Sequence, residues 1–379
     1  MDLRNIKQST PPGPEGPKAS AVDQDRGRPA DPADAERAWA RVARSYGEPD
    51  ARRSILQTVA TIGPLVVLWL LMVWTLDYGY WITLLLAVPA AGFVVRLFMI
   101  QHDCGHGSFF RSRRLNDLLG RAIGVVTLTP YEHWRNAHAV HHATSGNLGR
   151  RGVGDVDLLT VDEYLALPRW RRLVYRLYRN PVVIFGIGPI YLFVLKHRLP
   201  LLMPNGGWRG VFSVLWTNIA IAGFVALAMV SFGVSEFLLV QAPITMLASS
   251  IGVWLFFVQH QFERTYWEHD ARWSFHTAAL RGSSYYVLPR VLRWFTASIG
   301  IHHVHHLCSR IPNYRLQECL DDHAGLRDFS RVTLLDSLKC VRLTLWDEDA
   351  KRLIGFRQLR ARSAEKKADS LPSVWPANR

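Results

Sequence analysis

Four long apolar segments constrain the fold of this 379-residue chain more than any other feature. They are residues 55–76, 81–100, 211–232 and 237–258. Arg96 is a charge within them, and Glu236 lies directly beside one of them. A transmembrane helix needs roughly 20 apolar residues to cross a hydrocarbon core about 30 Å thick. The sequence therefore predicts an all-α integral membrane protein with four transmembrane helices in two hairpins.

The distribution of positive charge predicts how these helices are oriented. None of the 45 lysine and arginine residues lies in residues 54–95 or 210–263, so the two short connections between spans carry none. Positively charged loops tend to stay on the cytoplasmic side of a membrane. We therefore expect both termini and the long central segment to be cytoplasmic. The net charge of +14 fits anionic lipid headgroups beside the spans, and we expect no nucleic-acid partner.

The remaining residues divide the chain into three parts. Residues 1–50 are rich in Pro, Arg and Asp, which predicts a disordered arm. Within this arm, Ala35–Tyr46 is expected to form a basic amphipathic helix on the membrane surface. Residues 51–330 form the membrane domain, and residues 331–379 are expected to be a cytoplasmic tail. The apolar residues 182–195 are too few to span a bilayer, so we expect an interfacial or re-entrant segment there.

Histidines gather on the predicted cytoplasmic side and repeat at helical spacing. Nine of the 15 histidines follow this pattern: His102, His106, His138, His141, His142, His260, His302, His305 and His306. Residues three or four positions apart share one face of a helix. Three helices can therefore direct eight imidazoles at one place. His260, two residues beyond the fourth apolar segment, adds a ninth.

Nine imidazoles are too many for one metal ion, because a tetrahedral zinc site takes four ligands and a catalytic one often three. The pattern predicts two ions with open coordination positions, and imidazole alone does not choose among zinc, copper, iron and nickel. His303 points about 100° away from His302 on a helix, so we expect it to support a ligand or to contact the surface. Lone histidines such as His197 and His323 are expected to be surface residues and not ligands. The spacing is also lacking at His133, His269 and His276, which are expected to be ordinary residues.

Three histidine motifs carry a resemblance to a known family. Residues 102–106 read His-Asp-Cys-Gly-His, residues 138–142 read His-Ala-Val-His-His, and residues 302–306 read His-His-Val-His-His. In this order and with this spacing from the spans, they resemble the three histidine boxes of membrane fatty acid desaturases. Further segments are similar to the bacterial acyl-lipid branch, which includes Δ5- and Δ12-type enzymes: residues 143–148, 154–155, 160–164, 259–260 and 282–286. The resemblance covers about residues 50–330.

The resemblance implies an enzyme of a bacterial inner membrane that inserts a double bond into the acyl chain of a lipid, with O₂ as co-substrate. It implies two non-haem iron ions, held by the eight box histidines and His260 in a cytoplasmic helical cap. The irons themselves are the expected catalytic centre, without a separate acid or base. The sequence contains no His-Pro-Gly-Gly signature of a fused cytochrome b5 domain, so the electrons are expected from a separate protein such as a ferredoxin.

Polar residues close to the boxes are candidates to hold the ligands in place. A metal-bound histidine usually donates its second ring N–H to a carboxylate, a carbonyl or water. The candidates for this contact are Asp103, Asn147, Asp155 and Glu263.

Other functions stay open at this level. The same boxes serve hydroxylases, epoxygenases and carotenoid ketolases, although the Gly- and Tyr-rich residues 282–286 favour a desaturase. A metal transporter or sensor would need acidic or histidine residues within the spans, and the four apolar segments carry essentially none. The sequence pattern does not determine the position of the double bond, the chain length, the acyl carrier or the oligomeric state.

Reporter fusions test the predicted orientation. Because the two short connections carry no positive charge, fusions at Tyr78 and Gly233 should report an external location. Fusions after Arg172 or His323 should report a cytoplasmic one. An external signal after Arg172 would contradict the four-span topology.

Overall fold

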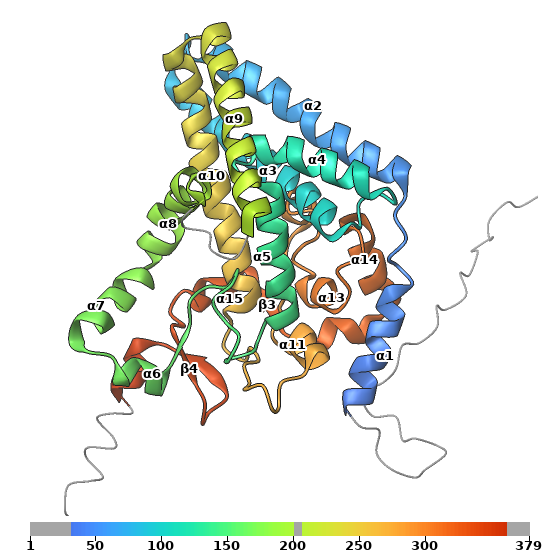
Figure 1. The fold of residues 1–379 in the computed structure, drawn as a ribbon, viewed down its shortest axis with the longest axis vertical. Coiled ribbons are helices and arrows are strands. Elements are labelled where there is room, and N and C mark those ends of the chain that lie inside the picture. The colour runs from blue at the N-terminus through green and yellow to red at the C-terminus, as the bar shows by residue number, and fades with distance from the viewer. Residues whose placement is uncertain (1–31, 201–206, 362–379) are drawn as a thin grey trace, which may run out of the picture.

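The computed structural model describes residues 32–200 and 207–361, and four long helices dominate it (Figure 1). They are α2 (Ala51–Thr75), α3 (Tyr80–His106), α9 (Gly207–Phe232) and α10 (Val234–His260). Within the described residues these four helices are long and apolar enough to cross a membrane. The four predicted spans are thereby confirmed, and the protein is an integral membrane protein.

The long helices form two hairpins whose turns depend on glycine. Gly79 lies between α2 and α3 with φ 136°, and Gly233 lies between α9 and α10 with φ 101°. These are values that residues with a side chain rarely adopt. The small buried residues Ala87 and Ala91 of α3 let its backbone approach the neighbouring helices α2 and α10 closely. The outward faces expose large apolar side chains, such as Val230 at 86%, which suits contact with lipid.

A bent helical pair lies between the two hairpins. α7 (Arg169–Tyr178) is followed by Val183–Arg198, and the two parts meet at an angle of 56°. The second part runs through η1 (Val183–Ile187), α8 (Gly188–Ile190), η2 (Tyr191–Leu195) and η3 (Lys196–Arg198). It packs against α10 (Figure 1). A bend of this size fits the interfacial or re-entrant segment predicted for residues 182–195, and its depth in the membrane stays a prediction.

Most of the remaining elements form a cap at the end of the bundle where α3 and α10 finish, whereas α4 (Arg113–Val126) lies beside α3 and α9 (Figure 1). The other helices are α1 (Pro32–Arg44), α5 (Tyr131–Thr144), α6 (Val161–Ala166), α11 (Phe275–Arg281), α12 (Arg290–Phe295), α13 (His302–Leu307), α14 (Asn313–Asp322), η6 (Ala324–Asp328) and α15 (Leu334–Cys340). The predicted predominantly helical fold is confirmed.

Two small sheets complete the cap. In the first, β4 (Leu345–Asp347) lies between β1 (Leu159–Thr160), to which it is parallel, and β5 (Arg352–Ile354), to which it is antiparallel. In the second, β2 (Tyr285–Val287) pairs in parallel with β3 (Arg331–Thr333). These strands hold distant segments of the cap together without changing its helical character.

The predicted cytoplasmic tail begins too early at residue 331. Residues 331–361 include β3, α15, β4 and β5, and Trp346 and Leu353 are fully buried against Leu148 and Trp267. The apolar residues of these short strands form a core. The polar composition of the predicted tail gave no indication of this core. The folded part of the cap therefore extends to at least residue 361, and residues 362–379 lie outside the described residues.

The amphipathic helix predicted over Ala35–Tyr46 forms as α1, but its apolar face meets protein. Trp39, Ala40 and Ala43 are buried in a core that includes Leu316 of α14 and Val304 of α13. The expectation that this face lies on the membrane surface is wrong, because the cap covers it. The rest of the predicted N-terminal arm, residues 1–31, lies outside the described residues.

Candidate metal centre

Four elements bring the nine predicted histidines to one place in the cap. The first box forms the end of α3, the second lies on α5, the third lies on α13, and His260 is the last residue of α10. The rings form two groups, in each of which one nitrogen per residue lies within 4.8 Å of all the others. The histidines at helical spacing therefore form two candidate sites. The assignment of metal ions to these sites stays a prediction.

The first group contains five histidines: His102, His106, His138, His142 and His305. Their Nε2 atoms follow one another at 3.3 Å from His102 to His106, and at 3.1 Å from His106 to His138. The same spacing of 3.1 Å joins His138 to His142 and His142 to His305. His106, His138 and His142 are half-buried, so this group lies on the more open side of the centre.

The second group contains four histidines that are all buried: His141, His260, His302 and His306. The Nε2 atom of His260 lies 3.2 Å from that of His141 and 3.0 Å from that of His302, which is 3.1 Å from that of His306. The ring of His306 stacks on that of His142 at 4.1 Å between centroids. The two groups are therefore direct neighbours.

The spacing of the nitrogens fits a shared cation. With a metal–imidazole distance of about 2.1 Å, two ligands at right angles lie about 3.0 Å apart. The neighbouring Nε2 atoms lie 3.0 to 3.3 Å apart in both groups. An imidazole carries at most one proton when neutral, so these converging nitrogens cannot all be satisfied by bonds to one another. The residues present fit two metal ions.

The environment also keeps the imidazoles in the form that binds metal. Burial, followed by the proximity of the other histidines, holds the pKa of His138, His142, His302, His305 and His306 well below its ordinary range. These rings are therefore neutral at physiological pH. A neutral imidazole has a free lone pair, which is the requirement for metal ligation.

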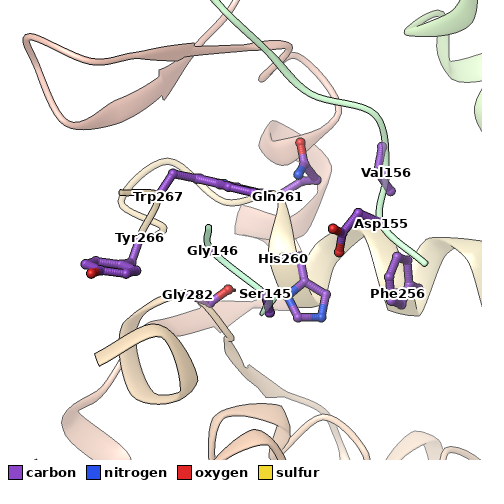
Figure 2. A pocket seen from close by; sticks show the side chains of 10 residues that line it. All are labelled: Ser145, Gly146, Asp155, Val156, Phe256, His260, Gln261, Tyr266, Trp267 and Gly282. Carbon is purple, nitrogen blue, oxygen red and sulfur yellow. Dashed lines mark hydrogen bonds between the residues drawn. The ribbon is translucent and has the colours of Figure 1, made fainter. Parts of the chain in front are cut away.

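Ring orientation is fixed by contacts to the other nitrogen, Nδ1. The Nδ1 of His141 lies 2.6 Å from Asp155 Oδ1, and that of His102 lies 3.2 Å from Asp103 Oδ1. The Nδ1 of His260 lies 3.3 Å from the carbonyl oxygen of Gly282. Figure 2 shows His260 with Asp155 nearby, beside a small cavity of about 10 Å³. Such contacts select the tautomer that leaves Nε2 free for a metal.

Two of the four predicted supporting residues do not touch the histidines. The side-chain amide of Asn147 donates to Asp270 at 2.9 Å, and its oxygen accepts the backbone N–H of Gly149 at 2.9 Å. Glu263 is exposed and pairs with Arg352 at 3.2 Å. The expectation that Asn147 and Glu263 hold ligand N–H groups is therefore wrong, because Asn147 binds loop residues and Glu263 binds Arg352 of β5. Asp103 and Asp155 make the expected kind of contact.

His303 lies outside both groups, as its helical position predicts, but it is not a surface residue. Its ring is fully buried, and Nε2 lies 2.8 Å from the carbonyl oxygen of Leu326 in η6. Burial lowers the pKa of His303 to about 4. This side chain anchors α13 to the outer part of the cap, so the expectation of a surface contact is wrong.

The remaining histidines also stay outside the two groups. His269 forms an exposed pair with Glu348, and His323 contacts Tyr46 at 3.2 Å. His197 lies near the carbonyl oxygen of Leu128. The expectation that His197 and His323 are surface residues is wrong, because both side chains are buried.

Two supporting residues were missed by sequence reasoning. Trp134 stacks on the ring of His138 at 4.7 Å between centroids, and its position four residues earlier on α5 could have indicated this. Asn313 donates from its backbone and side chain to Asp103 Oδ2 at 2.7 and 2.8 Å. The second contact joins residues 210 positions apart, so no local pattern could have revealed it.

An apolar cavity of about 970 Å³ borders the histidine groups. His102 and His138 of the first group and His302 of the second line it. The rest of its wall comes mainly from α3, α10, α5 and the segment Val183–Arg198. The cavity therefore connects the candidate metal centre with the membrane-facing helices. This size lies at the upper end of small-molecule pockets, which are about 300–1,000 Å³.

A membrane bundle that ends in two histidine groups beside an apolar cavity defines a class: membrane proteins that use histidine-bound metal on hydrophobic molecules. The family model described as fatty acid desaturase matches residues 79–334, which is well over half of the chain. The protein belongs to the fatty acid desaturase family. It is accordingly an enzyme that introduces double bonds into fatty acyl chains.

Named relatives agree with this assignment. The chain is 45% identical over 317 residues to a fatty acid desaturase of Bacillus subtilis, covering 83% of this chain and 89% of the relative. It is 30% identical over 243 residues to the sn-1 acyl-lipid omega-3 desaturase (ferredoxin) of Synechocystis, covering 59% and 62%. It is 27% identical over 224 residues to the sn-1 oleoyl-lipid 12-desaturase of Synechocystis, covering 58% and 62%. The alignments with the two Synechocystis proteins span less than two thirds of those chains.

Substitutions in the third box separate ligands from a structural neighbour. His302→Ala, His305→Ala and His306→Ala should each lower bound metal and abolish desaturation, because each removes a converging nitrogen. His303→Ala should keep its metal but lose about 1–3 kcal/mol of stability, because the Leu326 carbonyl loses its buried donor. Metal content and thermal unfolding of the purified variants check this. His303→Gln, which retains a donor, is the matched control, and loss of metal in His303→Ala with an intact fold would contradict the assignment.

Proposed function

We propose that the protein inserts a double bond into an acyl chain of a membrane lipid, at two iron ions held by the nine histidines of the two groups. The observation that carries this proposal is that His102, His138 and His302 line the large apolar cavity. Ligands of both groups thus border one space of a kind that an acyl chain can fill. Two ions held by these neighbouring groups would supply the chemistry for a reaction that uses O₂ next to the substrate.

The cavity wall supports an acyl chain as the substrate. Residues of the membrane helices, such as Val94 and Val95 of α3 and Leu255 of α10, line it, and so do Ile184 and Ile187 of the bent segment. Each buried CH₂ group of a substrate would contribute about 0.8 kcal/mol to binding. The affinity for an extended apolar ligand therefore grows with the length of chain that is buried. Specific polar contacts next to the reacting carbons are not needed.

The overall reaction removes two hydrogen atoms from adjacent carbons, takes two electrons and two protons from outside, and reduces O₂ to two molecules of water. When bound, the iron pair supplies the capacity to use O₂ as the oxidant. The protein itself orients the histidines and keeps water away from the site. Asp103 keeps His102 in a fixed tautomer, and Asp155 does the same for His141. The rings of Phe98 and Trp134 pack edge to face at 5.4 Å between centroids. They form an apolar wall beside His102.

The proposal includes a separate electron donor. The sequence lacks a fused cytochrome b5 signature, and the name of one Synechocystis relative includes ferredoxin. The half-buried edge of the first group, at His106, His138 and His142, is the side of the centre closest to solvent. We place this side in the cytoplasm of a bacterial inner membrane, because the positive charges flank the spans at that end.

Two alternatives make different products. A related hydroxylase or ketolase would add oxygen to the chain, and a metal transporter or sensor would leave lipids unchanged. The transporter is disfavoured by the described spans, where Asp103, His102, His106 and His260 lie at the ends of α3 and α10 that join the cap, and Glu236 lies alone in the first turn of α10. They form a terminal cluster and not a path across the membrane.

Expression in a host without desaturases tests the proposed function. The host membrane should contain saturated phospholipids, and a ferredoxin with its reductase should be supplied. We expect lipid-bound acyl chains to lose two hydrogens, detected by mass spectrometry that also locates the double bond. His305→Ala is the matched inactive control.

Other outcomes point to the alternatives. A product with added oxygen would support a hydroxylase or ketolase. Accumulation of metal with unchanged lipids would support a transporter. Modification of free fatty acids or thioesters alone would contradict the choice of a membrane lipid as the substrate.

A further inference from the structure

The apolar cavity has a charged end that the chemistry above does not use. Among the described residues that line it, the side chains that carry a formal charge are Asp155, Asp157 and Lys196. Asp155 is engaged with His141. Asp157 and Lys196 therefore present one negative and one positive charge to a space that is otherwise mainly apolar.

Neither charge is neutralised by a close partner. In the described part of the chain, no ion pair within 4.0 Å involves either side chain. Asp157 uses its backbone N–H to donate to the hydroxyl of Tyr178 at 3.1 Å, which leaves its carboxylate free. Lys196 is half-buried, and Asp157 is accessible at the surface. A ligand could therefore reach both.

The two charges nevertheless line the same cavity. Partial burial raises the pKa of Asp157, and the Lys196 ammonium opposes this shift more strongly than Arg179 or Arg151 does. Burial, followed by the same ammonium, lowers the pKa of His133, which also lines the cavity. The Lys196 ammonium thus acts on both Asp157 and the imidazole of His133, and all three side chains line the same cavity.

The neighbouring arginines are committed elsewhere. Arg179 is buried and donates to the side chain of Gln261 at 3.0 Å and to the carbonyl oxygen of Leu343 at 2.8 Å. It also donates to the backbone carbonyl of Asp157 at 3.1 Å. Arg151 pairs with Glu163. The charged end is therefore formed by one free cation and one free anion, more than 4.0 Å apart.

The position of this end suits a lipid headgroup. Lys196 directly follows the apolar run Val183–Leu195, whose residues Ile187 and Tyr191 both line the cavity and expose large apolar surfaces. The segment lies beside α10, where the bundle meets the cap (Figure 1). A lipid whose acyl chain follows these apolar residues would place its polar end next to Lys196.

We infer that Lys196 and Asp157 bind the phosphate and the amine of a zwitterionic phospholipid headgroup, so that the substrate is an intact phosphoethanolamine lipid. The inference rests on the proposed desaturation of membrane lipids. A headgroup with two opposite charges neutralises both side chains. An anionic headgroup would satisfy Lys196 but bring its phosphate next to Asp157 without an amine. A coenzyme A thioester carries several phosphates, and the cavity offers them a single free cation.

Anchoring the headgroup also fixes the register of the acyl chain. Lys196 and the histidines border the same cavity, so the length of chain between the anchor and the histidines determines which carbons react. Loss of the anchor should therefore broaden the distribution of double-bond positions. A residue with only a structural role would lower activity without this effect.

Competition between two lipids tests the inference. Holoenzyme with ferredoxin and its reductase is assayed in vesicles that contain equal amounts of phosphatidylethanolamine and phosphatidylglycerol with identical saturated chains. The wild type should desaturate phosphatidylethanolamine about tenfold faster, the effect of one contact to a charged group. Asp157→Asn should remove most of this preference. Lys196→Met should slow both lipids and yield several double-bond positions.

Controls separate this test from folding and from the proposed function. Lys351→Met and Asp321→Asn change exposed charges outside the cavity and should behave as wild type, and all variants should keep their metal. Equal use of both lipids by the wild type would overturn the inference and leave the proposed function standing. An unchanged preference and a single double-bond position in both cavity variants would also overturn it. No desaturation of any phospholipid would overturn the proposed function itself.

Discussion

The convergence of nine imidazoles at the junction of bundle and cap is the constraint on which the rest of the structure depends. Burial and the proximity of the other histidines keep His138, His142, His302, His305 and His306 from taking up protons, and polar groups buried without partners are costly. In both groups the free Nε2 atoms point at one another at 3.0 to 3.3 Å. A cation in each group would resolve this conflict and would couple the centre to the fold of the cap.

The other features hold the converging helices in place. α3 and α10 continue beyond their apolar stretches, so each delivers histidines from a rigid span. Asp103 joins the end of α3 to the start of α14 through Asn313. His303 joins α13 to Leu326. Because α1 packs on this same part of the cap, a segment near the N-terminus also contributes to the rigidity of the centre.

The sequence predicted those parts of the structure that depend on the length of an apolar segment or on the helical spacing of residues. Apolar length identified the four spans, and helical spacing separated His303 from its three neighbours in the box. The division into two groups was not predictable, because α5 contributes His138 and His142 to one group and His141 to the other. That division depends on how α5 packs between α3 and α13.

Failures of sequence reasoning have a common physical cause. Asn147 and Glu263 lie close to the boxes along the chain, yet their side chains bind Asp270 and Arg352, because proximity in sequence does not fix the direction of a side chain. The burial of α1 and of Trp346 also depends on partners far along the chain. The cavity that ends at Lys196 and Asp157 likewise arises only from the assembly of distant helices.

The most direct test of the central claim is X-ray absorption at the iron edge, on protein purified with its metal and quantified for iron per chain. The proposed function predicts two irons per chain, with nitrogen neighbours at about 2.1 Å, the usual distance for imidazole ligands, and with the multiple-scattering pattern of histidine rings. A single iron per chain, or a shell dominated by sulfur, would contradict the assignment of the two histidine groups as a pair of metal sites.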